Sequence, residues 1–136
     1  MKIIFGLILL VAVFGLAYIR LAPTDLSRWH QMPDDIRNQD LTGGAVRVVP
    51  SDADTFERLD AIIRATPRTD VIAGAPDEGM VTYVTRSAVF GFPDYTTVRR
   101  AGGRVELYGR LRFGRSDMGV NAARIDGWLM RLRQGG

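Results

Sequence analysis

The sequence predicts an α+β domain behind an N-terminal apolar helix, and three observations lead to this prediction. An unbroken apolar run fills residues 3–19. Residues 51–65 and 122–133 place apolar side chains at helical spacing. Between these two segments, residues 104–113 alternate apolar and polar side chains, which is the period of a strand. We therefore expect an anchor, an extended arm, and a two-layer domain of a helix, a four-stranded antiparallel meander sheet and a C-terminal helix.

The apolar N-terminal segment, residues 1–20, is either a membrane anchor or a signal peptide. At about 1.5 Å per residue its apolar run reaches roughly 26 Å as a helix, the short end of the membrane-spanning range. A cleaved signal would use Lys2 as its basic region and the small residues of 15–17 as its cleavage site. The apolar core is longer than that of a typical signal and continues through Tyr18 and Ile19. We therefore favour an uncleaved transmembrane anchor.

Two arguments about the orientation of this anchor disagree. Arg20, Arg28 and Arg37 follow the segment, whereas only Lys2 and the amino terminus precede it, so the positive-inside rule favours a cytoplasmic domain. A short N-terminal tail before a signal anchor, however, most often leads to export of the domain that the anchor carries. We expect a single-pass protein of the bacterial inner membrane with its soluble domain in the periplasm.

Residues 21–50 are predicted to form an extended arm, because they contain three prolines, a glycine pair and no sustained hydrophobic period. Trp29 is the candidate anchor of this arm: its ring would lie at the membrane interface or pin the arm to the domain. Residues 45–49 are compatible with a short strand. The small α+β domain itself is expected to occupy residues 51–136.

Two amphipathic helices are expected to pack on the same face of the sheet. The first, residues 51–65, has N-cap candidates at Ser51, Asp52 and Asp54, and Pro67 prevents its continuation. Its apolar face consists of Phe56, Leu59, Ile62 and Ile63. The final helix has an apolar stripe of Ile125, Trp128, Leu129 and Leu132.

Four strands are expected between these helices. They are a first strand from residue 70 to a turn at 75–79, then residues 80–86, 95–100 and, after a Gly102-Gly103 turn, 104–113. In the fourth strand Val105, Leu107, Leu111 and Phe113 point one way, and Arg104, Glu106, Tyr108, Arg110 and Arg112 the other. This alternation predicts a strand buried on one face only.

The exposed face would carry Arg104, Arg110 and Arg112 as candidate contacts for an anion or a partner. Charge is unevenly distributed: residues 21–79 have six Arg against eleven acids, a net charge of −5, and residues 80–136 have ten Arg against four acids, a net charge of +6. Arg binds carboxylate and phosphate in a bidentate manner, although a GC-rich genome would also favour Arg over Lys. The face has too few aromatic side chains for nucleic acid, so lipid phosphates or an acidic protein surface are the expected ligands.

Residues 111–133, LRFGRSDMGVNAARIDGWLMRLR, form either a site or a turn that starts a helix. The structural interpretation makes Asn121 the N-cap and lets Ser116 or Asp117 bond to local backbone groups. The functional interpretation places an anion at the amides of the helix start, beside Arg112 and Arg115. The spacing fits neither a P-loop nor a dinucleotide fingerprint, and we favour the structural interpretation.

Catalytic and metal-binding residues are not predicted. The chain contains no cysteine and a single histidine, His30, which removes disulfides and thiolate chemistry and disfavours zinc. A hydrolytic triad would need His30 with Ser87 or Ser116 and Asp117, but no nucleophile-elbow motif is present. Paired carboxylates could come only from the acidic half of the chain, chiefly from the first helix, where we expect Glu57 and Asp60 to be solvated. We predict a non-enzymatic protein without a cofactor or metal.

Two stretches carry a family resemblance. TYVTRSAVFGFPDYTTVR and LYGRLRFGRSDMGVNAARIDGW resemble the bacterial domain-of-unknown-function family numbered 1499, over residues 22–132. RLAPTDLSRWH is similar to the arm that follows the hydrophobic segment in α-proteobacterial members, and SDMGVNAARI is the most recognisable part. The resemblance implies a small membrane-associated domain and no particular reaction, cofactor or site residue.

These observations rank three functions. The first is a membrane-anchored, non-enzymatic accessory subunit or assembly factor of a larger inner-membrane protein complex. The second is a domain that binds lipid or small anions through the Arg-bearing sheet face and residues 112–121. The third is a hydrolase with His30 as its candidate base.

Overall fold

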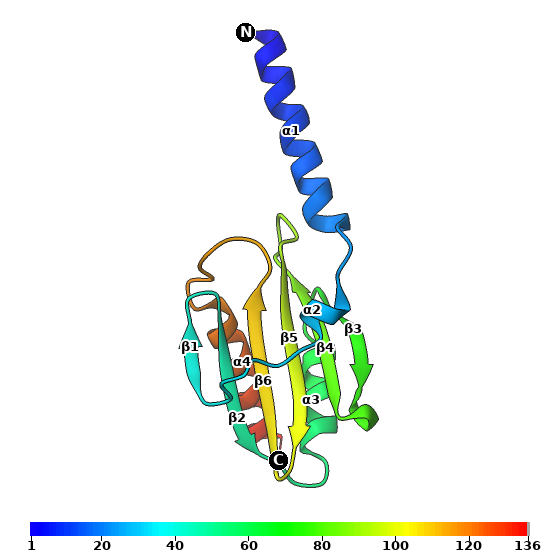
Figure 1. Cartoon of the computed structure of the whole chain (residues 1–136), viewed down its shortest axis with the longest axis vertical. Coiled ribbons are helices and arrows are strands. Elements are labelled where there is room, and N and C mark those ends of the chain that lie inside the picture. The colour runs from blue at the N-terminus through cyan, green and yellow to red at the C-terminus, as the bar shows by residue number, and fades with distance from the viewer. Residues whose placement is uncertain (136) are drawn as a thin grey trace.

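Helix α1, Lys2–Leu21, projects from one end of an α+β domain in the computed structural model, which describes residues 1–135 (Figure 1). Its mean hydropathy reaches 2.5 and none of its residues is buried. In the described part of the chain it is the one helix with the length and composition to cross a membrane. This apolar helix was predicted from the sequence, and it is compatible with a membrane anchor or a signal sequence.

The sheet contains six antiparallel strands rather than the predicted four. They are β1 (Gln39–Leu41), β2 (Gly44–Pro50), β3 (Thr69–Ala75), β4 (Met80–Arg86), β5 (Pro93–Ala101) and β6 (Arg104–Leu111), in the spatial order β1-β2-β6-β5-β4-β3. The two additional strands lie within the predicted arm, residues 21–50. Strand β2 pairs with β6 from Gly44↔Arg110 to Pro50↔Arg104, so this part of the segment belongs to the domain.

Two glycines allow close approach around β6. A Cβ at Gly44 would collide with the carbonyl oxygen of Gly109 on the neighbouring strand. A Cβ at Gly109 would lie 2.9 Å from Ile125 Cδ1 and 3.0 Å from Asn121 Oδ1 of the final helix. Glycine at these positions therefore lets β2 pair closely with β6 and lets the helix lie directly on the sheet.

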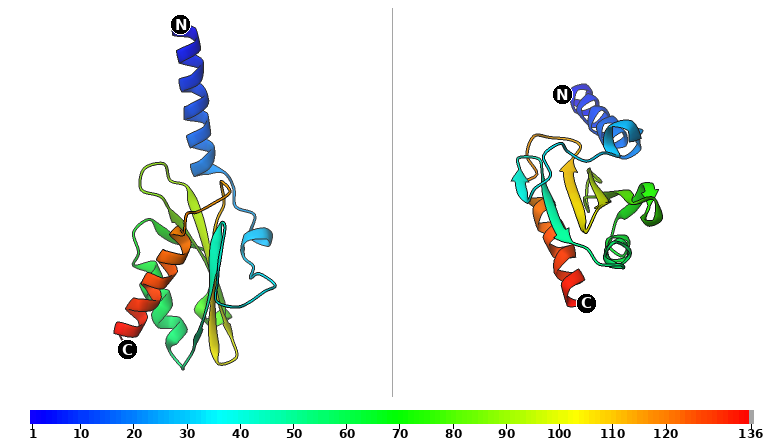
Figure 2. Two further views of the ribbon diagram at one scale, coloured as in Figure 1. Left: turned by 90° about the vertical axis from the view of Figure 1, so that its left-hand side faces the viewer. Right: turned by 60° about the horizontal axis from the view of Figure 1, so that its bottom comes forward.

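Helices α3 (Thr55–Arg64) and α4 (Val120–Gln134) cover one face of the sheet (Figure 2). Both predicted helices are present, although the first begins at Thr55, because residues 51–54 form a turn in which Asp52 bonds to Thr55. The shared core consists of Phe56, Leu59, Ile63, Val81, Tyr83, Val98, Val105, Leu107, Ile125, Trp128, Leu129 and Leu132. The polar atoms of its aromatic residues Tyr83 and Trp128 have hydrogen-bond partners: the Tyr83 hydroxyl donates to Asp60, and the Trp128 indole donates to Thr66.

The opposite face of the sheet is covered by the arm, residues 22–38, which includes the short helix α2 (Leu26–Trp29) (Figure 2). Strand β6 is consequently buried on both faces: Glu106 is fully buried and Arg110 is 7% exposed. The prediction of a strand buried on one face only is wrong, because the alternate polar side chains have partners inside the protein. Arg110 bonds to the arm, whereas Glu106 pairs with arginines of β5 and β6. Glu106 lies between Arg99 and Arg104, with N–O distances of 2.6 and 2.9 Å.

The two outer strands of the sheet are short or irregular. Strand β1 is three residues long. Strand β3 has a bulge between Val71 and Ala73, and the chain then passes through the 3₁₀ turn η1 (Pro76–Glu78) into β4. Bulges and short outer strands limit further strand pairing.

Candidate functional site

Trp29 fixes the arm to the sheet. Helix α2 is capped by Asp25, whose Oδ1 accepts hydrogen bonds from the backbone N–H and the hydroxyl of Ser27. The Trp29 ring lies on the Tyr95 ring with 4.6 Å between centroids and a tilt of 41°. Of the two roles considered for Trp29, the structure places the ring against the domain.

A layer of polar side chains lies between the arm and the sheet. His30 Nδ1 is 2.7 Å from Thr82 Oγ1, and Thr82 Oγ1 is 2.8 Å from Thr97 Oγ1. Arg110 donates to the Thr97 hydroxyl and to the carbonyl oxygen of Trp29. The arm is thus held by directional bonds to groups that would otherwise be buried without partners.

Arg110 is a buried cation whose partners are neutral. Its guanidinium lies 4.4 Å from the Tyr108 ring centroid and 5.5 Å from that of Trp29, and its hydrogen bonds go to a hydroxyl and to carbonyl oxygens. Among the residues that the structure describes, no carboxylate forms an ion pair with it. Burial lowers the pKa of Arg110 to about 10, so the side chain remains protonated at neutral pH.

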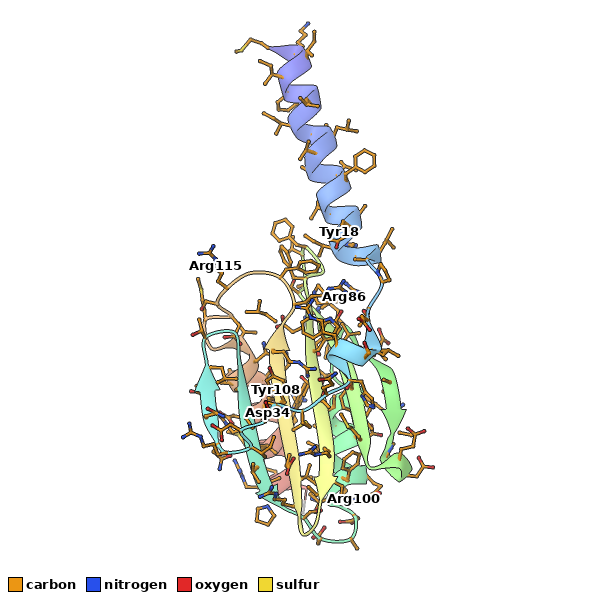
Figure 3. The ribbon with its side chains drawn as sticks, viewed as in Figure 1. Tyr18, Asp34, Arg86, Arg100, Tyr108 and Arg115 are labelled. Carbon is orange, nitrogen blue, oxygen red and sulfur yellow. The ribbon has the colours of Figure 1, made fainter. Side chains whose placement is uncertain are left out.

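A groove of about 480 Å³ opens beside Arg110, between the arm, strand β6 and the loop that follows β6. We call it the arm groove. Arg28 and Arg115 line it together with Arg110, and none of its lining residues is acidic. Figure 3 shows Tyr108 on the sheet and Arg115 on the loop. The remaining walls are mainly apolar or aromatic: Trp29, Met32, Pro33, Leu41, Tyr108 and Leu111.

The arginines predicted to share an exposed sheet face are in fact separated. Arg104 is engaged by Glu106. Arg112 donates to the Tyr95 hydroxyl and to the carbonyl oxygen of Pro23 in the arm. Only Arg110 and Arg115 of the predicted set line the arm groove, and the arm adds Arg28 to them. The Arg28-Trp29 pair in the arm was the available signal for this third arginine.

The loop before α4 serves as a helix start. Asp117 accepts hydrogen bonds from the backbone N–H groups of Gly119 and Asn121, at 3.1 and 2.9 Å. The Ser116 hydroxyl accepts from the N–H of Met118. The N-cap residue is Gly119, and the carboxylate that satisfies the first amides is that of Asp117, two residues earlier. The prediction of Asn121 as N-cap is wrong, because Asn121 lies inside the helix and is fully buried. An anion at these amides would have to displace Asp117.

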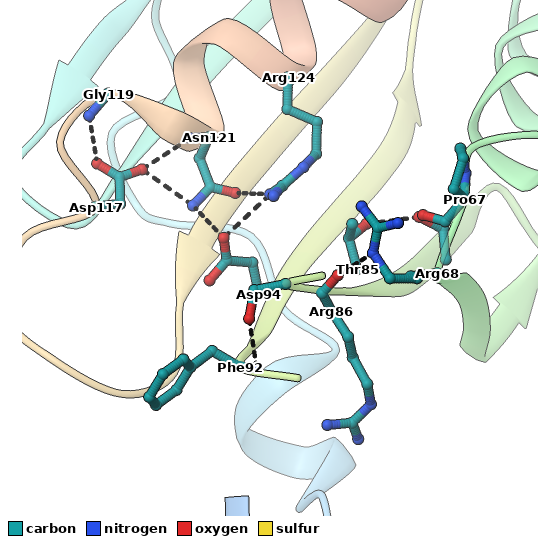
Figure 4. A network of polar contacts seen from close by, with 12 residues as sticks. Pro67, Arg68, Thr85, Arg86, Phe92, Asp94, Asp117, Gly119, Asn121 and Arg124 are labelled. Carbon is teal, nitrogen blue, oxygen red and sulfur yellow. Dashed lines mark hydrogen bonds and ion pairs between the residues drawn. The ribbon is translucent and has the colours of Figure 1, made fainter. Parts of the chain in front are cut away.

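Asn121 joins α4 to strand β5 (Figure 4). Its side-chain amide donates to Asp117 and Asp94, and its carbonyl oxygen accepts from Arg124. Arg124 also forms an ion pair with Asp94 at 3.1 Å. Burial raises the pKa of Asp94, whereas for Asp117 burial is outweighed by the hydrogen bonds from Asn121 and Gly119, which lower its pKa. These contacts give SDMGVNAARI a structural role.

The residues proposed for a hydrolytic triad are not brought together. His30 bonds to Thr82 beneath the arm. The Ser87 hydroxyl accepts from the N–H of Phe92, and Ser116 and Asp117 bond to the turn before α4. Glu57 forms an ion pair with Arg100, and the Asp60 carboxylate bonds to Tyr83 and Arg64. In residues 1–135, no group of three or more potential metal ligands is found.

Comparison with known proteins gives a family. A family described as "Protein of unknown function (DUF1499)" matches residues 25–132, most of the chain, and the chain belongs to this family. The match begins at the residue that caps α2 and ends in α4, so it covers the arm, the sheet and both packed helices. The comparison with curated proteins finds no match.

Proposed function

We propose that this family member is a membrane-anchored, non-enzymatic accessory subunit or assembly factor of a membrane protein complex, and that it binds an acidic segment of its partner in the arm groove. One observation carries the proposal: three arginines and no acid line a groove with apolar walls. Guanidinium groups bind carboxylates in paired hydrogen bonds. An acidic partner segment would therefore supply the counter-charges that the groove lacks.

The buried position of Arg110 supports this ligand. Its guanidinium is already removed from water, so binding would require little further desolvation of this group. A carboxylate placed beside it would act in a low-dielectric setting, where charge pairing is stronger than at the surface. The rings of Trp29 and Tyr108 both lie against the guanidinium, which limits its freedom before the ligand arrives.

The test is a pull-down of the tagged full-length chain, at native expression level, from gently solubilised membranes. We expect a stoichiometric protein partner to be identified by mass spectrometry. Replacing the exposed Arg28 and Arg115 by Ser should remove this partner, whereas the same charge change at Arg131 and Arg133 on the exposed side of α4 should not. A solitary wild-type protein, or equal retention by both variants, would argue against the proposal.

A small anion or a lipid headgroup is the second candidate ligand of the same groove, favoured by the unneutralised charge of Arg110. It replaces the exposed sheet face considered from the sequence, because the arm covers that face. This alternative predicts that inorganic phosphate raises the melting temperature of the wild-type protein more than that of the Arg28→Ser, Arg115→Ser variant. Equal shifts in the two proteins would exclude it.

The location of the domain in the periplasm belongs to the same proposal. The chain has no native cysteine, so Arg131→Cys introduces a single exposed thiol on α4. A membrane-impermeant maleimide should label this thiol in intact spheroplasts if the domain lies outside. Labelling only after lysis would place the domain in the cytoplasm and refute this part of the proposal.

A further inference from the structure

The end of the domain nearest α1 differs in composition from the opposite end. Among the loops at this end are residues 87–92, between β4 and β5, and residues 112–119, between β6 and α4 (Figure 1). Eight large apolar side chains after residue 21 are exposed in the described chain, and five of them lie on these loops or at the first residue of α4. They are Val89, Phe90, Phe92, Met118 and Val120. The turns at the opposite end, residues 51–54, 76–79 and 102–103, contain no large apolar side chain.

The last turn of α1 is joined to this end by direct contacts. Arg20 donates to the carbonyl oxygens of Val89 and Phe90, at 3.0 and 3.4 Å. Arg86 donates to the carbonyl oxygen of Ile19. The Tyr18 ring packs edge-on against Phe113, with 6.1 Å between centroids. The two loops therefore keep a fixed position beside the end of α1.

The length of α1 sets the depth of these loops. Its 20 residues give a helix of about 30 Å, the thickness of the hydrocarbon core of a bilayer. If α1 spans the membrane, the bilayer surface lies at its C-terminal turn, beside Val89 and Phe90. Apolar side chains at this depth are removed from water by the headgroup and acyl-chain boundary.

The charge at this end is also suited to a membrane. Arg20, Arg86, Arg112 and Arg115 lie on or beside the two loops, and none of the four forms an ion pair within the described residues. Figure 3 shows Arg86, Tyr18 and Arg115 at this end. Of the acids at this end, Asp94 and Asp117 are engaged by Arg124 and Asn121. Asp70 lines a pocket with Arg20 and Arg86, and Asp25 lines another with Arg112, without forming an ion pair with any of these arginines. Basic side chains at a bilayer surface are attracted to anionic lipids.

We infer that this end of the domain docks on the surface of the bilayer that holds α1: the apolar tips of both loops insert, and Arg115 contacts the phosphates of anionic phospholipids. The inference rests on the proposed anchor. It goes beyond the partner groove, because it assigns a different ligand to a second surface, which shares Gly114 and Arg115 of the 112–119 loop with that groove. The domain would then lie against the membrane rather than stand away from it.

The test uses the full-length chain in nanodiscs, with one cysteine introduced at a time and labelled with an environment-sensitive fluorophore. Met118 and Val89 are 93% and 73% exposed, so a label at either position disturbs little packing. Gly103, in the turn at the opposite end, is the matched control, and Leu10 reports on the anchor itself. We expect blue-shifted emission, with protection from an aqueous quencher, at positions 10, 89 and 118 but not at 103.

The possible outcomes distinguish a failure of membrane docking from a failure of the transmembrane anchor. Protection at position 10 without protection at 89 and 118 would refute docking while leaving the anchor intact. A label at position 10 that remains in water would refute the anchor, and the inference with it. Nanodiscs containing phosphatidylglycerol should give a larger shift at position 118 than pure phosphatidylcholine. Arg115→Gln should abolish this difference and Arg131→Gln should not; an equal shift in both lipids would refute the contact with phosphate.

Discussion

The two faces of the sheet are covered by different chemistry. Helices α3 and α4 bury an apolar core on one face, whereas the arm covers the other through threonines, His30 and the charged Arg110. Apolar burial is non-directional and contributes most of the stability of a domain. Hydrogen bonds contribute less net free energy but require defined partners. We therefore expect changes on the helix face to unfold the domain and changes on the arm face to detach the arm.

The largest effect is expected on the helix face from Leu107→Ala. Leu107 is fully buried, and its truncation should lower the free energy of unfolding by about 2–5 kcal/mol through lost burial and a cavity. Urea denaturation of the full-length protein in mild detergent measures this change. A loss below about 1 kcal/mol would mean that this face does not dominate stability.

The start of α4 should give the next largest effect. Asp117→Ala removes the acceptor of two backbone N–H groups and leaves the buried Asn121 amide with one partner fewer. The expected loss is about 2 kcal/mol in the same denaturation experiment. Ser116→Ala, which removes one exposed hydroxyl, is the neighbouring control. Equal losses in the two variants would contradict the capping role of Asp117.

The arm face should respond more weakly in global stability. Trp29→Ala removes the stacking on Tyr95 and should lower the free energy of unfolding by about 1 kcal/mol. The loss is small because the arm can detach locally while the rest of the domain stays folded. Tryptic cleavage within residues 22–38 should nevertheless become much faster. Leu26→Ala, on the same short helix but 44% exposed, should leave the cleavage rate unchanged. Unchanged cleavage in Trp29→Ala would argue against an arm held by this ring.

The smallest effect is a pH dependence at Asp117. The pKa of Asp117 is lowered in the folded state, so the ionised carboxylate stabilises the fold at any pH above its ordinary pKa of 3.8. This stabilisation is lost as the pH falls through the lower, folded-state pKa. Asp117→Asn should therefore be less stable than the wild type at pH 6, by less than about 1 kcal/mol. The difference should vanish in strong acid. A difference that is constant across the titration would exclude the carboxylate charge as its source.

The two faces also differ in how far the sequence predicted them. The helix face follows local periodicity, since Phe56, Leu59 and Ile63 recur at helical spacing, so both packed helices and the antiparallel strands between them were predicted. The arm face depends on distant pairs. Nothing local to Arg110 indicates that the carbonyl of Trp29 will accept its hydrogen bond, and an alternation of polar and apolar residues is also the pattern of a solvent-exposed strand.

The candidate site was predicted only in part for the same reason. Arg110 and Arg115 were proposed as contacts, but the groove between them exists only because the arm folds back across the sheet. Residues 45–49 of β2 were recognised as compatible with a short strand. Strand β1 was not predicted, because its three residues have no recognisable period. Asn121 was assigned to the wrong side of the helix boundary, because Asp117 and Asn121 are both good caps by residue type.

The irregular outer strands of the sheet have a consequence for crowding. If α1 anchors the protein as proposed, copies of it meet in the two dimensions of the membrane, where an open row of backbone N–H and C=O groups would promote fibril-like stacking. Here one edge strand, β1, is only three residues long, and the other, β3, is interrupted by the bulge between Val71 and Ala73. Neither edge strand is a regular template for another strand, so copies can lie side by side without pairing their sheets edge to edge.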